Sequence, residues 1–116
     1  MAAAPRRARK DRRTHHRYSV WFPVQIDADE LGQVVGITKD VSVKGMLLQT
    51  NADLFVGAPI SVTFRVHASG DPLQVDATVV RSEHNREGPW PFQLAVEFDD
   101  PLRYLEAPLR RESSAP

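Results

Sequence analysis

The sequence contains no cysteine and no long hydrophobic run. Without cysteine, the chain can form neither a disulfide framework nor a thiolate metal site, which fits a reducing compartment. No apolar segment approaches the roughly 20 residues that a membrane helix needs. The first residues are alanines, a proline and arginines, which do not form the apolar core of a secretory signal. We therefore expect a cytoplasmic protein without membrane insertion.

Sequence patterns typical of catalysis are also missing. The chain has no Gly-x-Ser-x-Gly elbow, no Walker-type glycine loop and no paired carboxylates in an apolar setting. No cysteine or carboxylate stands at metal-ligand spacing from the histidines, so a metal site is not expected. The four histidines are His15, His16, His67 and His84. We predict a binding protein rather than an enzyme, without metal or cofactor.

The formal net charge of zero conceals a strong asymmetry. Residues 1–19 carry six arginines and one lysine against one aspartate, a net charge of +6, so the remaining 97 residues carry −6. A cationic segment on an acidic body favours an anionic partner. Nucleic acid, a membrane surface, a nucleotide and an acidic patch on a protein all qualify, and charge alone does not choose among them.

Short segments with alternating apolar residues predict an all-β fold. Turn residues separate these segments, and no stretch between them supports a long amphipathic helix. Six strands at such spacing favour a small antiparallel barrel or sandwich, and a closed barrel leaves no exposed sheet edge. The predicted strands are residues 20–26, 33–39, 45–50, 60–66, 73–82 and 92–98.

The 116 residues suit one domain with short extensions. We expect a flexible basic arm over residues 1–11, a barrel domain over 12–106 and a disordered tail over 107–116. Asp99-Asp100-Pro101 is typical of a helix start, which predicts a short helix over Leu102 to Glu106 that ends near Pro108.

Two short motifs are candidates for the binding site. The first is Arg13-x-x-x-Arg17, ahead of the first strand, although Arg9 repeats the same spacing within the basic arm. The second is Asp40-x-Ser42-x-x-Gly45, between the second and third strands, which alone is compatible with an ordinary turn. Together with Pro23-Val24 and the final strand over 92–98, these motifs strongly resemble the PilZ domain family over roughly residues 11–105.

The resemblance implies a fold, a ligand and a set of contacts. It implies a six-stranded antiparallel barrel that binds the bacterial second messenger cyclic di-GMP without turning it over. An arginine just before the first motif implies an intercalated ligand dimer. The arm would become ordered over the ligand and signal through contact with an effector protein that the sequence does not identify. The residues implied as ligand contacts are Arg12, Arg13, Arg17, Asp40, Ser42 and Gly45.

The chemistry of these residue types suits such a ligand. The planar fork of arginine can bind phosphate, or the O6 and N7 acceptors of guanine, bidentately, and it can stack on a purine. Asp40 can accept hydrogen bonds from guanine N–H groups, and Ser42 can donate or accept. Gly45 admits a backbone or a base where a Cβ would clash.

Two other functions remain open. A small barrel with a basic arm can bind nucleic acid, but here the body is acidic and exposed aromatics beyond Trp21 and Trp90 are few, so nucleic acid is the less favoured partner. The chain can also be an adaptor of the same family that contacts only proteins. Retention of both motifs argues against this second alternative.

Overall fold

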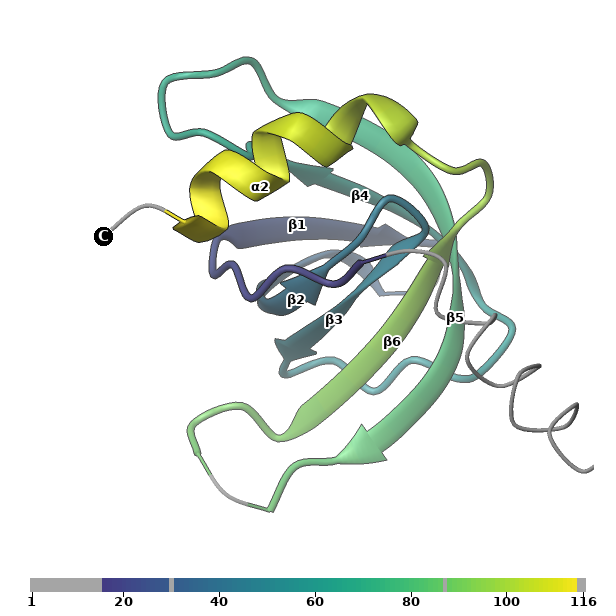
Figure 1. Cartoon of the computed structure of the whole chain (residues 1–116). Coiled ribbons are helices and arrows are strands. Elements are labelled where there is room, and N and C mark those ends of the chain that lie inside the picture. Colours follow the sequence, from purple (N-terminus) through teal and green to yellow (C-terminus); the bar gives the residue numbers. More distant parts are fainter. Residues whose placement is uncertain (1–15, 30, 87, 115–116) are drawn as a thin grey trace, which may run out of the picture.

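The computed structural model describes residues 16–29, 31–86 and 88–114. In this part of the chain, six strands close into a barrel in the order β1-β2-β3-β6-β5-β4, and every neighbouring pair is antiparallel (Figure 1). The strands are β1 (Pro23–Ala28), β2 (Gly32–Val41), β3 (Gly45–Thr50), β4 (Pro59–Phe64), β5 (Leu73–His84) and β6 (Phe92–Phe98). The predicted six-stranded antiparallel barrel is confirmed.

The barrel closes because each strand places alternate apolar side chains inside. Ile26, Leu48, Val62 and Leu94 are fully buried and come from four different strands. Three phenylalanines add a stack across the interior: the ring of Phe64 lies 5.5 Å from that of Phe22 and 6.4 Å from that of Phe98, measured between centroids. Period-two burial therefore produces a single core inside the closed sheet.

The alternation in β2 has the opposite sense to the one that its apolar residues suggest. Val35 and Ile37 share one face, but Val35 is exposed and Ile37 is half-buried. The inner positions are instead Gly36 and Thr38. A Cβ on Gly36 would lie 2.6 Å from the carbonyl oxygen of Gln49, so close contact between the β2 and β3 backbones excludes a side chain there.

The C-terminal region differs from the sequence-based prediction. A 3-10 turn, η1 (Arg103–Leu105), leads into helix α2 (Glu106–Ser114), so the expected helix end near Pro108 is wrong. The tail predicted to be disordered over 107–116 is helical over residues 107–114, and residues 115–116 lie outside the described residues. Pro108 lies in the first turn of α2, where its missing N–H costs nothing. Leu105 and Leu109 are buried, which fixes α2 across one end of the barrel (Figure 1).

Asp99 does not cap a helix. The residue before η1 is Leu102, which makes no side-chain capping hydrogen bond. The Asp99 carboxylate instead accepts a hydrogen bond of 3.2 Å from the hydroxyl of Thr78 in β5. The predicted arm over 1–11, together with Arg12 and Arg13, lies outside the described residues. Within the described residues, no helix is long and apolar enough to cross a membrane.

Candidate functional site

Arg17, which precedes β1, pairs with Asp40 near the end of β2. Arg17 Nη1 donates a hydrogen bond to Asp40 Oδ1 over 3.2 Å, and both side chains remain accessible to solvent, at 59% for Arg17 and 24% for Asp40. The backbone next to this ion pair is paired on both sides, because Tyr18 N–H donates to Val41 O over 2.8 Å and Val41 N–H donates to Tyr18 O over 2.9 Å. One residue from each predicted motif is thus brought to the same surface.

A β-bulge in β2 directs Asp40 outward. The register between β2 and β3 shifts between Thr38 and Asp40. As a result, Thr38 and Val41 both face the core while Lys39 and Asp40 both lie outside it. In a regular strand, Asp40 would share the inward face with Thr38. The bulge is therefore what presents the carboxylate to Arg17.

Ser42 begins a tight turn between β2 and β3. Its backbone N–H donates to Gly45 O over 2.8 Å, and its hydroxyl oxygen accepts from Lys44 N–H over 3.1 Å. These two bonds fix the turn and leave the Ser42 O–H as a donor. At the far side of the turn, Lys44 Nζ lies 3.7 Å from the exposed Glu97 carboxylate. The turn thus places a hydroxyl, a lysine and Asp40 on neighbouring residues.

Gly45 has a role in the barrel itself. A Cβ at this position would lie 2.1 Å from the carbonyl oxygen of Val96 in β6. Its φ angle is not positive, so the turn does not require glycine for conformational reasons. The close backbone approach foreseen from the sequence is therefore that of strand β6.

Thr38 holds the segment that leads into β1. Its hydroxyl donates to Val20 O over 2.6 Å and accepts from Phe22 N–H over 3.0 Å, and the side chain is fully buried. One side chain thus satisfies two backbone groups of residues 20–22. Sequence analysis missed this positioning residue, because the apolar residues Val35 and Ile37 suggest a strand in which Thr38 faces outward.

Tyr18 connects the same segment to α2. Its hydroxyl donates a short hydrogen bond to Glu106 Oε2, which also accepts from Arg110 Nη2 over 3.0 Å. The hydrogen bond to Glu106 raises the pKa of Tyr18, and burial and the Glu106 charge add to this. The same bond, with the charge of Arg110, lowers the pKa of Glu106. The rings of His16 and Tyr18 pack in a T-shaped arrangement at a centroid distance of 4.4 Å.

These contacts link the neighbour of Arg17 to a helix 88 residues further along the chain. The period of two that predicts β1 extends back to Tyr18, and Glu106 and Arg110 stand one helical turn apart. The sequence therefore held a signal for each partner, but none for their contact.

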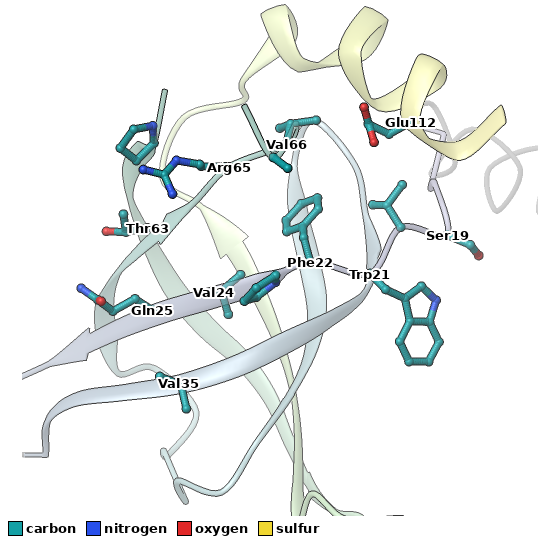
Figure 2. A pocket seen from close by; sticks show the side chains of 14 residues that line it. Ser19, Trp21, Phe22, Val24, Gln25, Val35, Thr63, Arg65, Val66 and Glu112 are labelled. Carbon is teal, nitrogen blue, oxygen red and sulfur yellow. The ribbon is translucent and has the colours of Figure 1, made fainter. Parts of the chain in front are cut away.

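A hollow of about 860 Å³ opens beside the site (Figure 2). It is lined by the 19–25 segment, by Thr63 of β4 and by residues of the β4–β5 connection, and Glu112 of α2 lies at its upper side in the figure. Trp21 projects outward at its margin and is exposed. Arg17, Asp40 and Ser42 are not among the residues that line it, so this hollow and the ion pair are separate features.

The described residues contain no group of three or more histidine, aspartate or glutamate side chains that could hold a metal ion. Of the predicted contacts, the structure brings Arg17, Asp40, Ser42 and Gly45 to one end of β2 and β3. Arg12 and Arg13 lie outside the described residues.

With the barrel and its motifs in place, comparison with protein families matches residues 11–112 to the PilZ domain. The chain belongs to the PilZ domain family. A search of curated proteins gives no match.

Solved structures share the fold at low sequence identity. The PilZ domain of Escherichia coli YcgR, solved with c-di-GMP, superposes with a TM-score of 0.68 at 17% identity, covering 88% of each chain. The Bacillus subtilis inhibitor of motility MotI/DgrA gives 0.69 at 15% identity, covering 88% of this chain and 49% of that one. The PilZ domain of CeSA from a cellulose-synthesizing bacterium gives 0.57 at 20% identity, covering 84% and 94%.

Proposed function

We propose that this protein is a receptor for cyclic di-GMP. The observation that carries the proposal is the exposed Arg17–Asp40 pair beside the Ser42 turn, in a chain of the PilZ family. The similar E. coli YcgR domain was solved with this ligand, which supports the same ligand class here.

The pair prepares both groups for a ligand. An exposed ion pair of this kind is worth only about 0–1 kcal/mol, so Arg17 can exchange the carboxylate for a phosphate or a guanine edge at little cost. The released Asp40 carboxylate accepts from guanine N1–H and N2–H groups. The Ser42 hydroxyl, whose oxygen already accepts a hydrogen bond from Lys44 N–H, donates a hydrogen bond to a phosphate oxygen.

Arg12 and Arg13 complete the proposed site from the preceding segment. A ligand that gathers these arginines with Arg17 neutralises their mutual repulsion and orders the segment on the barrel. The ordered surface would then contact an effector protein. Two ligand molecules per domain are expected, because Arg12 suits an intercalated dimer.

Calorimetry with cyclic di-GMP tests the proposal on the whole chain, with cyclic di-AMP as the matched control. Cyclic di-AMP carries the same two phosphates but lacks the guanine O6 acceptor and N2 donor. We expect saturable binding of cyclic di-GMP at two molecules per chain and at least tenfold weaker binding of cyclic di-AMP. Equal affinity for both would contradict guanine recognition, and one ligand per chain would contradict the dimer. Binding only to DNA or RNA, with steep salt dependence, would favour the nucleic-acid alternative.

A further inference from the structure

The barrel end formed by the β1–β2 turn and the β3–β4 loop exposes apolar side chains. Phe55 is 62% exposed and Val56 is 60% exposed, with Leu31 on the neighbouring turn and Val80 on β5. These four are a majority of the seven large hydrophobic residues that are exposed in the described part of the chain. We call these four residues, together with Asp29 and Asp53, the apolar end.

Both turns hold these side chains away from the core. Ala58 N–H donates to Phe55 O over 3.1 Å, and Gly57 supplies the positive φ of +96° that such a turn needs. The loop is tied to β5 by Gly57 N–H to Val79 O at 2.7 Å and by Val79 N–H to Ala58 O at 3.0 Å. Turn tips usually carry polar residues. Here the backbone holds the side chains of Phe55 and Val56 in solvent, where they add no buried apolar area to the core.

A small cavity lies between the two turns. Its volume is about 170 Å³, and Leu31 and Phe55 form part of its lining together with Leu54 and Pro59. Asp29 and Asp53 also line it and are exposed. The apolar end therefore combines an apolar recess with two carboxylates at its margin.

The two chain segments that form the apolar end carry charge of one sign. Residues 27–34 and 51–60 contain four acidic residues and no lysine or arginine. Arg81, which follows Val80, has its guanidinium 3.6 Å from the Glu83 carboxylate. A partner that fills the recess must also meet uncompensated negative charge, which selects cationic flanks.

We infer that the apolar end docks a segment of another protein in which an apolar side chain is flanked by lysines or arginines. The apolar side chain enters the recess between Leu31 and Phe55, and the flanking cations lie against Asp29 and Asp53. A second copy of this chain fits less well, because a two-fold contact through this surface would oppose aspartate to aspartate. The inference goes beyond the proposed receptor function, since it needs no ligand.

The apolar end is distant from the Arg17–Asp40 pair. The two sites lie at opposite ends of β2, whose ten residues span about 30 Å at the usual rise of a strand. A docked segment therefore leaves the ligand site open, so the receptor can hold its partner before and after ligand binds.

A peptide titration followed by NMR tests this inference on the full chain. The probe is a synthetic 12-residue peptide with a Leu-Trp anchor between lysine pairs, and the control peptide has glutamates in place of the lysines. We expect the lysine peptide to shift amide signals of residues 29–32, 53–58 and 80. Asp53→Lys and Phe55→Ser should each weaken its affinity at least tenfold. The matched controls Asp71→Lys and Tyr104→Ser, which alter an exposed aspartate and an exposed aromatic elsewhere, should not.

Three results would overturn the inference. The first is equal binding of the lysine and glutamate peptides, and the second is unchanged affinity in Asp53→Lys with its fold intact by circular dichroism. The third is concentration-dependent dimerisation in sedimentation that Phe55→Ser abolishes, which would assign the surface to a second copy. Calorimetry with cyclic di-GMP on Asp53→Lys and Phe55→Ser separates this inference from the proposed function, because the affinity for cyclic di-GMP should stay unchanged in both variants.

Discussion

Replacing Gly45 by alanine should destabilise the barrel rather than act on a ligand. The added Cβ would lie 2.1 Å from Val96 O, where ordinary contact begins near 3.4 Å, so strands β3 and β6 must separate by more than an ångström. These strands pair over six residues, from Gly45↔Glu97 to Thr50↔Phe92. Overpacking typically costs about 1–3 kcal/mol, and a clash with fixed backbone lies at or above the top of that range. We expect a loss of about 3 kcal/mol and a fall in Tm of more than about 10 °C.

Urea unfolding followed by circular dichroism measures this loss, with Gly70→Ala as the control. Gly70 lies in the β4–β5 connection, where a Cβ would lie 3.3 Å from His67 O, just short of ordinary contact, and where φ is not positive. We therefore expect the free energy of unfolding to change by less than about 0.5 kcal/mol. If Gly45→Ala instead matches the wild-type midpoint and loses only ligand affinity, the glycine serves the ligand and the argument from strand packing is refuted.

Three further predictions concern the segment before β1. Thr38→Val leaves Phe22 N–H and Val20 O buried without partners, so unfolding in urea should show a free energy of unfolding that is lower by about 2 kcal/mol or more. A loss below about 0.5 kcal/mol would refute the role of Thr38 in holding this segment. The lowered pKa of Glu106 means that the carboxylate's contribution to stability is present above its ordinary pKa of 4.5 and is lost as pH falls through the lower folded pKa. Hydrogen-exchange protection factors in α2, which correct for the intrinsic pH dependence of exchange, should therefore fall in acid in wild type, and an equal fall in Glu106→Gln would contradict this. Trp21 lies on the outward face shared by Arg17 and Ser19, so cyclic di-GMP should quench its fluorescence in Trp90→Phe, whereas quenching in Trp21→Phe instead would place the ligand elsewhere.

The barrel could be predicted because its strands are short and strongly alternating. Five of the six predicted strands begin within one residue of the observed strands, and two of them, β3 and β6, match at both ends. The alternation of β4 and β6 was visible from one sequence. The apolar residues of β2 were misleading for a physical reason. Close strand packing forced glycine inside at position 36, so the valine at position 35 was left outside.

The site was predictable only in part. The motif residues Asp40 and Ser42 were found from the sequence, but the bulge that turns Asp40 outward was not, because one inserted residue leaves no mark in a short strand. The contact between Tyr18 and Glu106 joins residues far apart in the chain, and no local pattern encodes it. Helix α2 was missed because Pro108 suggests a stop, whereas in the first turn it is compatible with a helix.

The most direct test of the receptor function is calorimetry of cyclic di-GMP with Arg17→Ala and with Arg81→Ala. Both arginines are exposed and both pair with a carboxylate, at 3.2 Å in Arg17–Asp40 and 3.6 Å in Arg81–Glu83, so the two variants remove equivalent surface charge. Loss of a bidentate arginine contact of about 1–3 kcal/mol predicts roughly 5- to 150-fold weaker binding for Arg17→Ala. Arg81→Ala should bind like wild type. Equal affinities in wild type and Arg17→Ala, or no binding of cyclic di-GMP by the wild-type chain, would contradict the proposed function.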